Sequence, residues 1–464
     1  MARVNYERKT ASASDLDFRL DTIRQILADL GDPHHQLKTI HIAGTKGKGS
    51  TASFVSQIGS WLGLKTAIYS SPHFERYTER FRIDNSEVCE STLAPYLTRV
   101  LDLAESLDEE IAAGRSNLKP ATFFDISTAT AFLLFADHEV ELLALEVGLG
   151  GRLDSTNVCR SDVSIVTNIS LDHTRQLGSS TVEIAAEKAG IIKPNVPVVC
   201  GPVNDSVFDV IKQKADSSSK SIIRYGHDFG PVDSSTRFEE SRFQFDYQEA
   251  FSGVVLEQIE LNGFAEHQVA NACLAIAAIN QFVRKSLDAS PKDVANAVRE
   301  GISKTQLAGR LELVSSDPLV VADMAHNEAS IGAMNDSLSR ISRGGKRQVI
   351  FSCSRDKDYR SMLCLLDSFF DRIILTEFHS NPRFCQTSML QEELKSLRNE
   401  SGNVENLSTE VISIEDPESA YRHAIADAAE YEMTVVCGSI FLVGELLPVM
   451  RTDPNQLSHG SESR

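Results

Sequence analysis

Short apolar runs rich in β-branched residues recur along the chain, and longer stretches with apolar residues at helical spacing separate them. This alternation is typical of an α/β protein with a mostly parallel sheet. The strands predicted for a first series are residues 39–43, 142–147, 163–169 and 196–200, and those for a second series are residues 319–323, 348–353, 372–377 and 434–437. Two series of strands predict two α/β domains.

The segment between the two series has a different pattern. Residues 204–261 are polar and serine-rich with aromatic side chains at alternate positions, and we interpret them as an antiparallel extension of the first domain. Two helices are predicted to follow, at residues 268–282 and 291–301, and residues 303–306 are the predicted linker between the domains. The domains expected from this pattern are residues 1–304 and 305–464, and the polar tail from 452 onward is predicted to be frayed.

Composition and charge narrow the class of protein. The chain has 464 residues, of which 42% are hydrophobic and 24% charged, as in ordinary globular proteins. Its 46 basic and 65 acidic side chains give a net charge of −19, which argues against a binder of nucleic acid or membrane surfaces, because both need a basic face. No apolar run approaches the roughly 18 residues that span a bilayer, and the first ten residues lack the apolar core of a secretory signal. The eight cysteines form no Cys-x-x-Cys pair, as is typical of free thiols in a reducing compartment, so we expect a cytoplasmic protein.

The most informative motif is a glycine-rich loop between the first strand and a helix. The apolar strand runs into Gly44-Thr-Lys-Gly-Lys-Gly-Ser50, and apolar residues at helical spacing follow. Glycines let successive backbone N–H groups converge on an oxyanion at a helix N-terminus, so the loop predicts a nucleotide site. In such a loop Lys48 reaches the β- and γ-phosphates, and the hydroxyl of Ser50 or Thr51 faces Mg²⁺. The alternative is a glycine-rich turn without a ligand, and no Asn-Lys-x-Asp motif supports guanine recognition.

Three residues near later strand ends are candidates to act with this loop. Glu146 closes a predicted strand, and because ligands bind outside the carboxyl ends of parallel strands, we expect a metal-holding acid there. His173 follows the next strand and is expected beside Glu146. Lys188 lies on a predicted helix that a capping box opens and Gly190 closes. The simpler interpretations are an exposed strand-end acid, a solvent-facing histidine and a lysine that complements the helix C-terminus.

Together these motifs resemble the folylpolyglutamate synthase/dihydrofolate synthase family, a branch of the Mur ligase superfamily of ATP-dependent amide-forming enzymes. The blocks that carry the resemblance include the glycine-rich loop, the run Leu145-Glu-Val-Gly-Leu-Gly-Gly-Arg-Leu-Asp-Ser-Thr-Asn157 and the run Asp323-Met-Ala-His-Asn327. Further matching blocks begin at Ser70, Glu79, Leu171, Glu187, His267, Gly309, Asp356 and Gly438. The resemblance implies an α/β fold: a P-loop-containing, Mur-ligase-like central domain with a parallel-rich sheet, and a smaller, Rossmann-like C-terminal α/β domain.

The resemblance also implies roles for individual residues. Those expected to bind ATP are Thr45, Lys46, Gly47, Lys48, Gly49, Ser50, Asn271, Arg310, Asp323 and His326. Those expected to bind the pterin-bearing substrate are Thr122, Phe123, Phe124, Asp125, Leu153, Asp154 and Ser155. Two Mg²⁺ ions are expected, one near Ser50 held by Ser71 and Glu146, and one held by Glu146, His173 and Lys188 as a carbamate. The expected catalytic residues are Lys48, Glu146, His173 and Lys188, and a monovalent cation is a further candidate cofactor.

The sequence departs from the family pattern at four positions. Lys46 replaces an asparagine that is frequent in the family, a variant that resembles the eukaryotic members, and Asp125 stands where a glutamate is usual. Met324 and Glu328 replace a glycine and a proline. None of these changes removes an expected metal ligand.

The implied activity is the addition of L-glutamate to dihydropteroate or a reduced folate through an acyl phosphate, with release of ADP and phosphate. We expect a monomer whose partners are these small molecules, with no nucleic acid and no membrane. The alternative is a ligase of the same superfamily that acts on a non-folate substrate. Muramyl-peptide ligases carry a domain before the phosphate loop, whereas 43 residues precede Gly44 here, fewer than the roughly 50 of a small domain. A non-catalytic nucleotide switch would not need Glu146, His173 and Lys188 together, and the phosphate loop argues against a purely structural protein.

Overall fold

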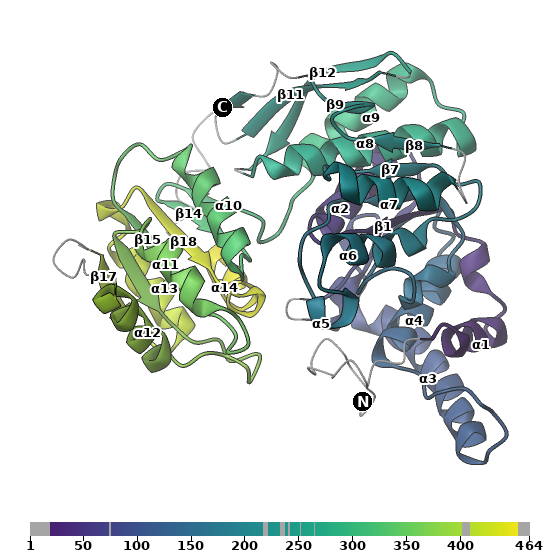
Figure 1. Cartoon of the computed structure of the whole chain (residues 1–464), viewed down its shortest axis with the longest axis horizontal. Coiled ribbons are helices and arrows are strands. Elements are labelled where there is room, and N and C mark those ends of the chain that lie inside the picture. The colour runs from purple at the N-terminus through teal and green to yellow at the C-terminus, as the bar shows by residue number, and fades with distance from the viewer. Residues whose placement is uncertain are drawn as a thin grey trace. The chain divides into compact units, whose positions relative to one another are not determined.

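The computed structural model describes residues 19–73, 76–216, 221–232, 237–239, 242–250, 252–263, 265–400 and 409–452. The chain divides into two compact units, Met1–Asn262 with His267–Gln306, and Gly263–Glu266 with Leu307–Arg464 (Figure 1). The first half of the predicted linker is helical, because helix α9 (Pro291–Lys304) continues through it and Thr305 Oγ1 still donates to Gly301 O at 2.7 Å. The domain bounds 1–304 and 305–464 stay a prediction, and the predicted frayed tail lies, after residue 452, outside the described residues.

Unit 1 is built on an eight-stranded sheet with the order β4-β3-β2-β5-β1-β6-β7-β8. The strands are β1 (Thr39–Ala43), β2 (Thr66–Tyr69), β3 (Phe81–Ile83), β4 (Ser86–Glu87), β5 (Leu142–Glu146), β6 (Ser161–Val166), β7 (Val198–Cys200) and β8 (Ile222–Arg224). Strands β2, β5, β1, β6, β7 and β8 are parallel to one another. Strands β3 and β4 extend the sheet beyond β2 as an antiparallel edge. All five residues of β1 are buried, as in a central parallel strand that is covered on both faces.

Helices cover the sheet of unit 1. They are α1 (Asp21–Asp29), α2 (Lys48–Trp61), α3 (Glu90–Ala112), α4 (Phe123–Asp137), α5 (Thr174–Leu177), α6 (Thr181–Lys188), α7 (Asp205–Asp216), α8 (His267–Ser286) and α9, with 3₁₀ turns η2 (Pro33–His35), η3 (Tyr77–Arg80), η4 (Ser155–Val158) and η5 (Ala189–Ile191). Helix α2 packs against α8 and α9, whereas α4 packs against α1 and α3. Figure 1 shows α1, α3 and α4 gathered at one end of the unit. Their apolar side chains form a core with the buried faces of β2 and β5.

The first part of the segment between the two series of strands differs from the prediction, because it contains helix α7 and strand β8, which pairs in parallel with β7 of the large sheet. The second part forms a separate small antiparallel sheet, as predicted. It consists of β9 (Phe229–Pro231), β10 (Arg237–Glu239), β11 (Arg242–Glu249) and β12 (Val254–Asn262). The pairings of these four strands with one another are antiparallel. In β11 the side chains of Phe243, Phe245 and Tyr247 are buried at every second position. This period of two is the reason for the aromatic alternation in the sequence.

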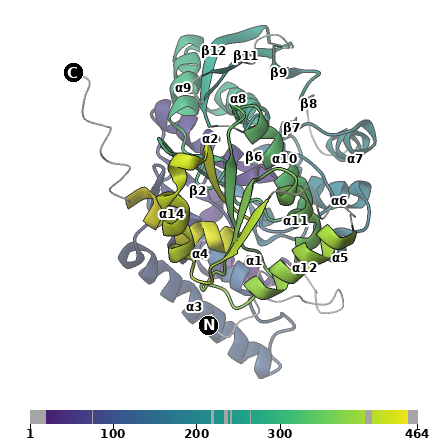
Figure 2. The same ribbon diagram turned by 90° about the vertical axis from the view of Figure 1, so that its left-hand side faces the viewer.

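Unit 2 is built on a six-stranded sheet with the order β13-β14-β18-β15-β16-β17. The strands are β13 (Glu312–Ser316), β14 (Leu319–Ala322), β15 (Arg347–Phe351), β16 (Arg372–Leu375), β17 (Glu410–Ser413) and β18 (Met433–Cys437), and only the β13 edge is antiparallel among the described strands. The helices are α10 (Glu328–Ser339), α11 (Tyr359–Asp367), α12 (Thr387–Glu400), α13 (Pro417–Ala426) and α14 (Ile440–Thr452), with a 3₁₀ turn η6 (Ala428–Glu430). Right-handed crossovers place α10, α11 and α12 on one face of this sheet and α13 on the other. The contacts agree, since α11 packs against α10 and α12 (Figure 2), and α13 packs against α14.

The α/β class and the parallel-rich sheets predicted from the sequence are confirmed. The predicted strand 163–169 is wrong at its end, because β6 stops at Val166 and the following residues turn to hold the phosphate loop. The short strands β2, β3, β4 and β17 and the helix α3 were not predicted. In the described part of the chain, every helix is too short or too polar to pass through a bilayer.

Candidate active site

The phosphate loop is held in place by the segment that follows β6. The loop leaves β1 at Ala43, and α2 begins at Lys48. The backbone N–H groups of Thr45 and Lys46 donate to Asn168, to its carbonyl oxygen at 2.9 Å and to its Oδ1 at 2.8 Å. The hydroxyl of Thr167 donates to Lys46 O at 2.7 Å. Thr167 and Asn168 therefore act as supports of the loop, and sequence reasoning missed both because neither carries a charge or belongs to a phosphate motif.

Glycine is required at two positions of the loop. Gly44 has φ +152°, and a Cβ atom there would lie 1.8 Å from Thr167 Oγ1. Gly47 has φ +84° at the N-cap of α2, and a Cβ atom there would lie 2.4 Å from Asn271 Oδ1. The second contact places Asn271, a predicted nucleotide ligand on α8, directly against the loop. Its amide is oriented by Gln268, whose Oε1 accepts from Asn271 Nδ2 at 2.8 Å.

Charged and hydroxyl groups converge where the loop meets the end of β5. Lys48 Nζ lies 3.8 Å from Glu146 Oε1, and both side chains are largely buried. The Ser71 N–H donates to Glu146 Oε2 at 3.4 Å, so the structure brings Ser71 to the same carboxylate. Ser50 is buried in the first turn of α2, and the buried hydroxyl of Thr51 has no hydrogen-bond partner among the described residues. Carboxylate and hydroxyl oxygens of this kind are ligands that Mg²⁺ prefers.

Lys188 reaches the phosphate loop from the last turn of α6. Lys188 is only 5% exposed, and its Nζ donates to Gly44 O at 2.9 Å. Burial, and after it the positive charge of Lys48, lowers the pKa of Lys188 to about 7. The simpler interpretation, a lysine that complements its own helix C-terminus, does not account for this burial or for the hydrogen bond to Gly44 O. The helix ends directly before Gly190, with Ala189 as the C-cap, but Gly190 lies in the 3₁₀ turn η5 and forms no left-handed cap. Glycine is needed there for the close approach of Arg152, because a Cβ at residue 190 would lie 2.4 Å from Arg152 Cβ.

His173 is placed differently from the other predicted metal ligands. It caps α5 in the left-handed conformation, with φ 48°, and its side chain is 56% exposed. Its Nε2 lies 3.9 Å from Asp172 Oδ1. The expectation that His173 acts beside Glu146 stays a prediction.

The two segments predicted to bind the pterin-bearing substrate meet through one carboxylate. Asp125 closes a capping box at the start of α4, where its Oδ2 accepts from the backbone and the hydroxyl of Thr122 at 2.9 and 2.7 Å. Its Oδ1 accepts from Ser155 Oγ at 2.6 Å. Asp125 is buried, and its oxygens bind protein groups from both segments. Its observed role is thus to fix these segments to each other, and contact with a pterin stays a prediction.

The residues around this junction divide into supports and partly exposed groups. Buried Asp154 accepts from the N–H groups of Thr156 and Leu149, and burial raises its pKa to about 6 although these hydrogen bonds favour the carboxylate. Leu153, Phe123 and Phe124 are partly exposed. The ring of Phe124 lies so close to Gly148 that a Cβ there would be 2.5 Å from its Cζ. The loop after Glu146 is therefore in contact with the predicted substrate segment.

A fully buried arginine lies next to Phe123. The Arg80 guanidinium carbon is 5.3 Å from the centre of the Phe123 ring, and Arg80 Nε donates to His73 Nδ1 at 2.7 Å. Arg80 and His73 belong to sequence blocks that match the family, but sequence reasoning assigned neither of them a role. A buried guanidinium beside partly exposed aromatic rings is a feature that only the folded chain reveals.

The predicted nucleotide residues of unit 2 form a group of their own within residues 309–326. Both oxygens of Asp323 accept backbone N–H groups, from Leu311 at 2.7 Å and from Ala325 at 2.8 Å. His326 Nδ1 lies 2.9 Å from Met324 O. Arg310 is exposed. Asp323 thus shapes the turn that carries Arg310, and the contacts of these residues with a nucleotide stay a prediction.

Comparison with known proteins agrees with this arrangement. Residues 42–279 match the Mur ligase middle domain, and residues 309–440 match the Mur ligase, glutamate ligase domain. The dihydrofolate synthase/folylpolyglutamate synthase of Escherichia coli (strain K12) is 30% identical over 94% of this chain and 92% of its own length. The corresponding protein of Bacillus subtilis (strain 168) is 29% identical over 92% of this chain and 94% of its own.

Solved structures show the same fold. Mycobacterium tuberculosis folylpolyglutamate synthase, solved in complex with ADP and AMPPCP, matches with a TM-score of 0.82 at 29% identity and covers 94% of this chain and 96% of that chain. Escherichia coli FolC in complex with DHPP and ADP matches with a TM-score of 0.76 at 28% identity, over 95% of this chain and 98% of that chain. This chain therefore belongs to the folylpolyglutamate synthase/dihydrofolate synthase family of ATP-dependent, amide-forming Mur ligases.

Proposed function

We propose that this protein attaches L-glutamate to the carboxyl group of a pterin-bearing substrate, dihydropteroate or a reduced folate, at the expense of ATP. The single observation that carries the proposal is the convergence of Lys48, Glu146, Ser71 and Lys188 on one phosphate loop in a chain of this family. Relatives solved with ADP, and one also with DHPP, support the choice of nucleotide and substrate class.

The chemistry proceeds in two displacement steps. A carboxylate oxygen of the substrate attacks the γ-phosphorus of ATP, the bond to the β–γ bridging oxygen breaks, and ADP leaves. The amine of L-glutamate then attacks the carbonyl carbon of the acyl phosphate, phosphate leaves, and the amine loses a proton. Reactions of this kind depend mainly on positioning and on neutralising charge.

Lys48 and the loop backbone supply positive charge where two anions must approach each other. The Lys48 ammonium is largely buried against Glu146, so its charge is poorly screened by water. The N–H groups at the start of α2 point toward the same region, as at other helix N-termini that bind phosphate. Asn271, which lies against Gly47, is positioned to orient the nucleotide at the loop.

The donor atoms at this site fit Mg²⁺. Glu146 and the hydroxyls of Ser71 and Ser50 would hold the first ion. The buried hydroxyl of Thr51, which has no hydrogen-bond partner in the described part of the chain, lies in the same turn of α2 as Ser50. When bound, Mg²⁺ would neutralise triphosphate charge and so lower the repulsion between the substrate carboxylate and ATP.

For the second Mg²⁺ we propose that Lys188 acts as a carbamate together with Glu146 and His173. The unmodified amine is a hydrogen-bond donor to Gly44 O and offers no anionic oxygen. Attack of the neutral amine on CO₂, with loss of one proton, would convert it into a group with two oxygens. The buried position of Lys188 beside the phosphate loop is what this role requires.

The proposal is tested by incubating the purified protein with ATP, Mg²⁺ and labelled L-glutamate, with dihydropteroate and tetrahydrofolate in separate reactions. We expect one ADP for each glutamate incorporated, and label in a product whose mass exceeds that of the acceptor by one glutamyl group. A reaction in which neither acceptor stimulates glutamate incorporation, while ATP is still bound, would favour a ligase for a non-folate substrate.

A further inference from the structure

A group of metal-ligating side chains lies outside the phosphate site, in the turn between α1 and β1. Asp32, His34 and His35 each offer one ligand atom, and these atoms all lie within 4.8 Å of one another. It is the one group of three or more such residues found in the described part of the chain. The two imidazole rings are adjacent, with centroids 4.0 Å apart and planes tilted by 46°.

The backbone holds these three side chains together. Asp32 adopts the left-handed conformation, with φ 53° and ψ 51°, as the N-cap of η2, and His34 and His35 form the rest of that turn after Pro33. The turn packs against α4, where the ring of His34 lies 5.6 Å from that of Phe132. The arrangement is therefore set by the fold rather than by flexible surface side chains.

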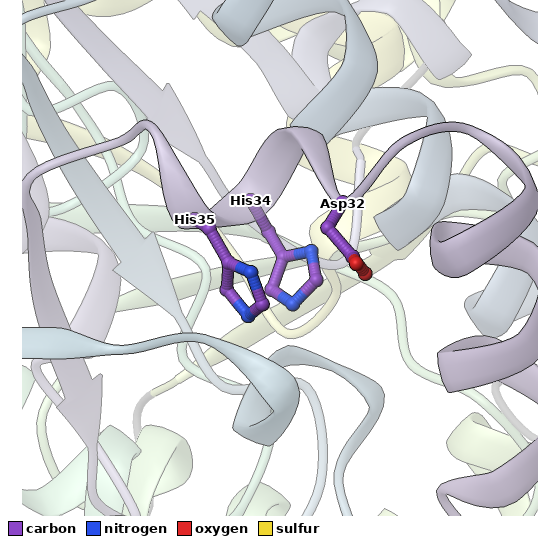
Figure 3. A group of neighbouring side chains, drawn as sticks. All are labelled: Asp32, His34 and His35. Carbon is purple, nitrogen blue, oxygen red and sulfur yellow. The ribbon is translucent and has the colours of Figure 1, made fainter.

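His34 provides a second and independent observation. The residue is 5% exposed, and its buried Nδ1 has no hydrogen-bond partner among the described residues. Figure 3 shows the His34 ring between Asp32 and His35, with one ring nitrogen directed toward the Asp32 carboxylate. A buried polar atom without a partner is costly, and a cation between the nitrogen and the carboxylate would satisfy both.

We propose that Asp32, His34 and His35 bind one divalent transition-metal ion, with Zn²⁺ as the ion that fits best. One carboxylate oxygen and two imidazole nitrogens form a mixed ligand set that suits Zn²⁺ and discriminates against Mg²⁺, which prefers oxygen ligands alone. Three protein ligands leave one tetrahedral position for water, and His35 is exposed, so water has access.

This site is separate from the proposed Mg²⁺ sites. It precedes β1 in the chain, whereas the phosphate loop follows β1, so the two lie at opposite ends of a five-residue strand, about 16 Å long at 3.3 Å per residue. A metal there would not touch the reacting groups. It would fix the connection between α1 and β1 against α4 and thereby stabilise unit 1.

The test uses the full-length protein with saturating Mg²⁺ and ADP, so that the phosphate site is filled. Zn²⁺ binding is measured by competition with a chromophoric chelator, and the ligands are identified by X-ray absorption at the zinc edge. Two variants, Asp32→Asn and His35→Gln, each remove one ligand from a residue that is not buried. Asparagine accepts the left-handed backbone of residue 32 and has nearly the same volume as aspartate, so the turn should be preserved.

His227→Gln is the matched control. His227 Nδ1 lies 3.1 Å from Asp228 Oδ1, so this pair offers an exposed histidine and a carboxylate without a third ligand among the described residues. We expect one Zn²⁺ per chain in the wild type and in the control, with nitrogen and oxygen ligands at about 2.0–2.2 Å. Both ligand variants should bind more than about 10-fold more weakly, since even outer partners of a metal contribute 10–100-fold.

Thermal unfolding provides a second measurement. Because Zn²⁺ would bind the folded chain, it should raise the Tm of the wild type and of His227→Gln but not that of Asp32→Asn or His35→Gln. Absence of stoichiometric Zn²⁺ binding would overturn the proposal, and so would wild-type affinity in either ligand variant. An absorption spectrum without nitrogen ligands would overturn it as well.

Discussion

The phosphate loop of unit 1 and the segment 309–326 of unit 2 both carry predicted nucleotide residues, but they use their charges differently. At the phosphate loop, charged side chains face one another: Lys48 lies 3.8 Å from Glu146, and Lys188 donates to the loop itself. In unit 2, the Asp323 carboxylate binds two backbone N–H groups and shapes a turn, while Arg310 is exposed. Residues of the first region can act on a ligand directly, whereas Asp323 acts through the backbone that it positions. The two regions should therefore respond differently to substitution, in rate for the first and in stability for the second.

The largest effect is expected from Lys48→Ala. Loss of one preorganised positive group at a transition state typically lowers kcat by about 10²–10³-fold, and Lys48 is the cation paired with the strand-end acid. The side chain is not part of the apolar core, so the fold should persist. The measurement is ADP release in the presence of glutamate and folate substrate, with circular dichroism as the check on folding.

Lys212→Ala is the control for this variant, because Lys212 is an exposed lysine on α7. It removes the same charge from the same unit and should leave the rate unchanged. Equal rates for Lys48→Ala and the wild type would contradict the assignment of the phosphate loop. Equal losses in both lysine variants would show that net charge, and not the position of Lys48, determines the rate.

The sequence was sufficient for the features that local patterns determine. Strand β1 has the bounds that its apolar run predicts, the capping box of α6 is present, and the aromatic alternation of β11 corresponds to its buried face. These features follow from side-chain periodicity and from hydrogen bonds between residues close in sequence. The same reasoning could not detect the edge strands β3 and β4, which are only three and two residues long.

The site itself could be predicted only in part, because its geometry depends on residues far apart in the chain. The glycine-rich loop and Glu146 were found from a motif and from a strand end. The contact of Asn271 with Gly47 and the hydrogen bond from Lys188 to Gly44 arise from packing between distant elements. A rule that considers Lys188 on its own helix alone predicts a cation that complements the helix C-terminus, and the structure shows a buried amine that donates to Gly44 O. Asp125 illustrates an omission of the opposite kind, since its Thr-x-x-Asp capping box is a local pattern that the sequence analysis did not point out.

The second prediction sharpens the role of Lys188 within the phosphate region. Lys188→Ala should lower the rate by at least about 10–100-fold, the usual cost of losing a partner in a metal site. Addition of bicarbonate after CO₂-free dialysis should raise the activity of the wild type and leave that of the variant unchanged. The pKa of Lys188 is lowered to about 7, so the neutral amine that reacts with CO₂ is populated from about pH 7 upward and is depleted below. Bicarbonate activation should therefore weaken as the pH falls below about 7.

Mass spectrometry alone is not decisive here, because carbamates decompose on acidification. Short carboxylic acids added to Lys188→Ala provide an independent control, since they can supply the missing oxygens and should restore part of its rate. A variant with near-normal turnover, together with a wild type that does not respond to bicarbonate, would show that Lys188 only supports the loop through Gly44.

The smallest change in rate is expected in unit 2, from Asp323→Asn. The amide keeps one oxygen but replaces the other with an N–H₂ group, so either Leu311 or Ala325 loses its acceptor. An unsatisfied buried N–H costs about 1–3 kcal/mol, and the free energy of unfolding should fall by that amount, measured by denaturant titration. Because Arg310 is carried by the same turn, the KM for ATP should rise while kcat falls less than in either lysine variant.

Asp336→Ala is the control, since Asp336 is an exposed acid on α10. If Asp323→Asn lowers kcat as strongly as Lys48→Ala and leaves stability unchanged, then Asp323 touches the reacting groups, and the two regions differ less than their hydrogen bonds indicate.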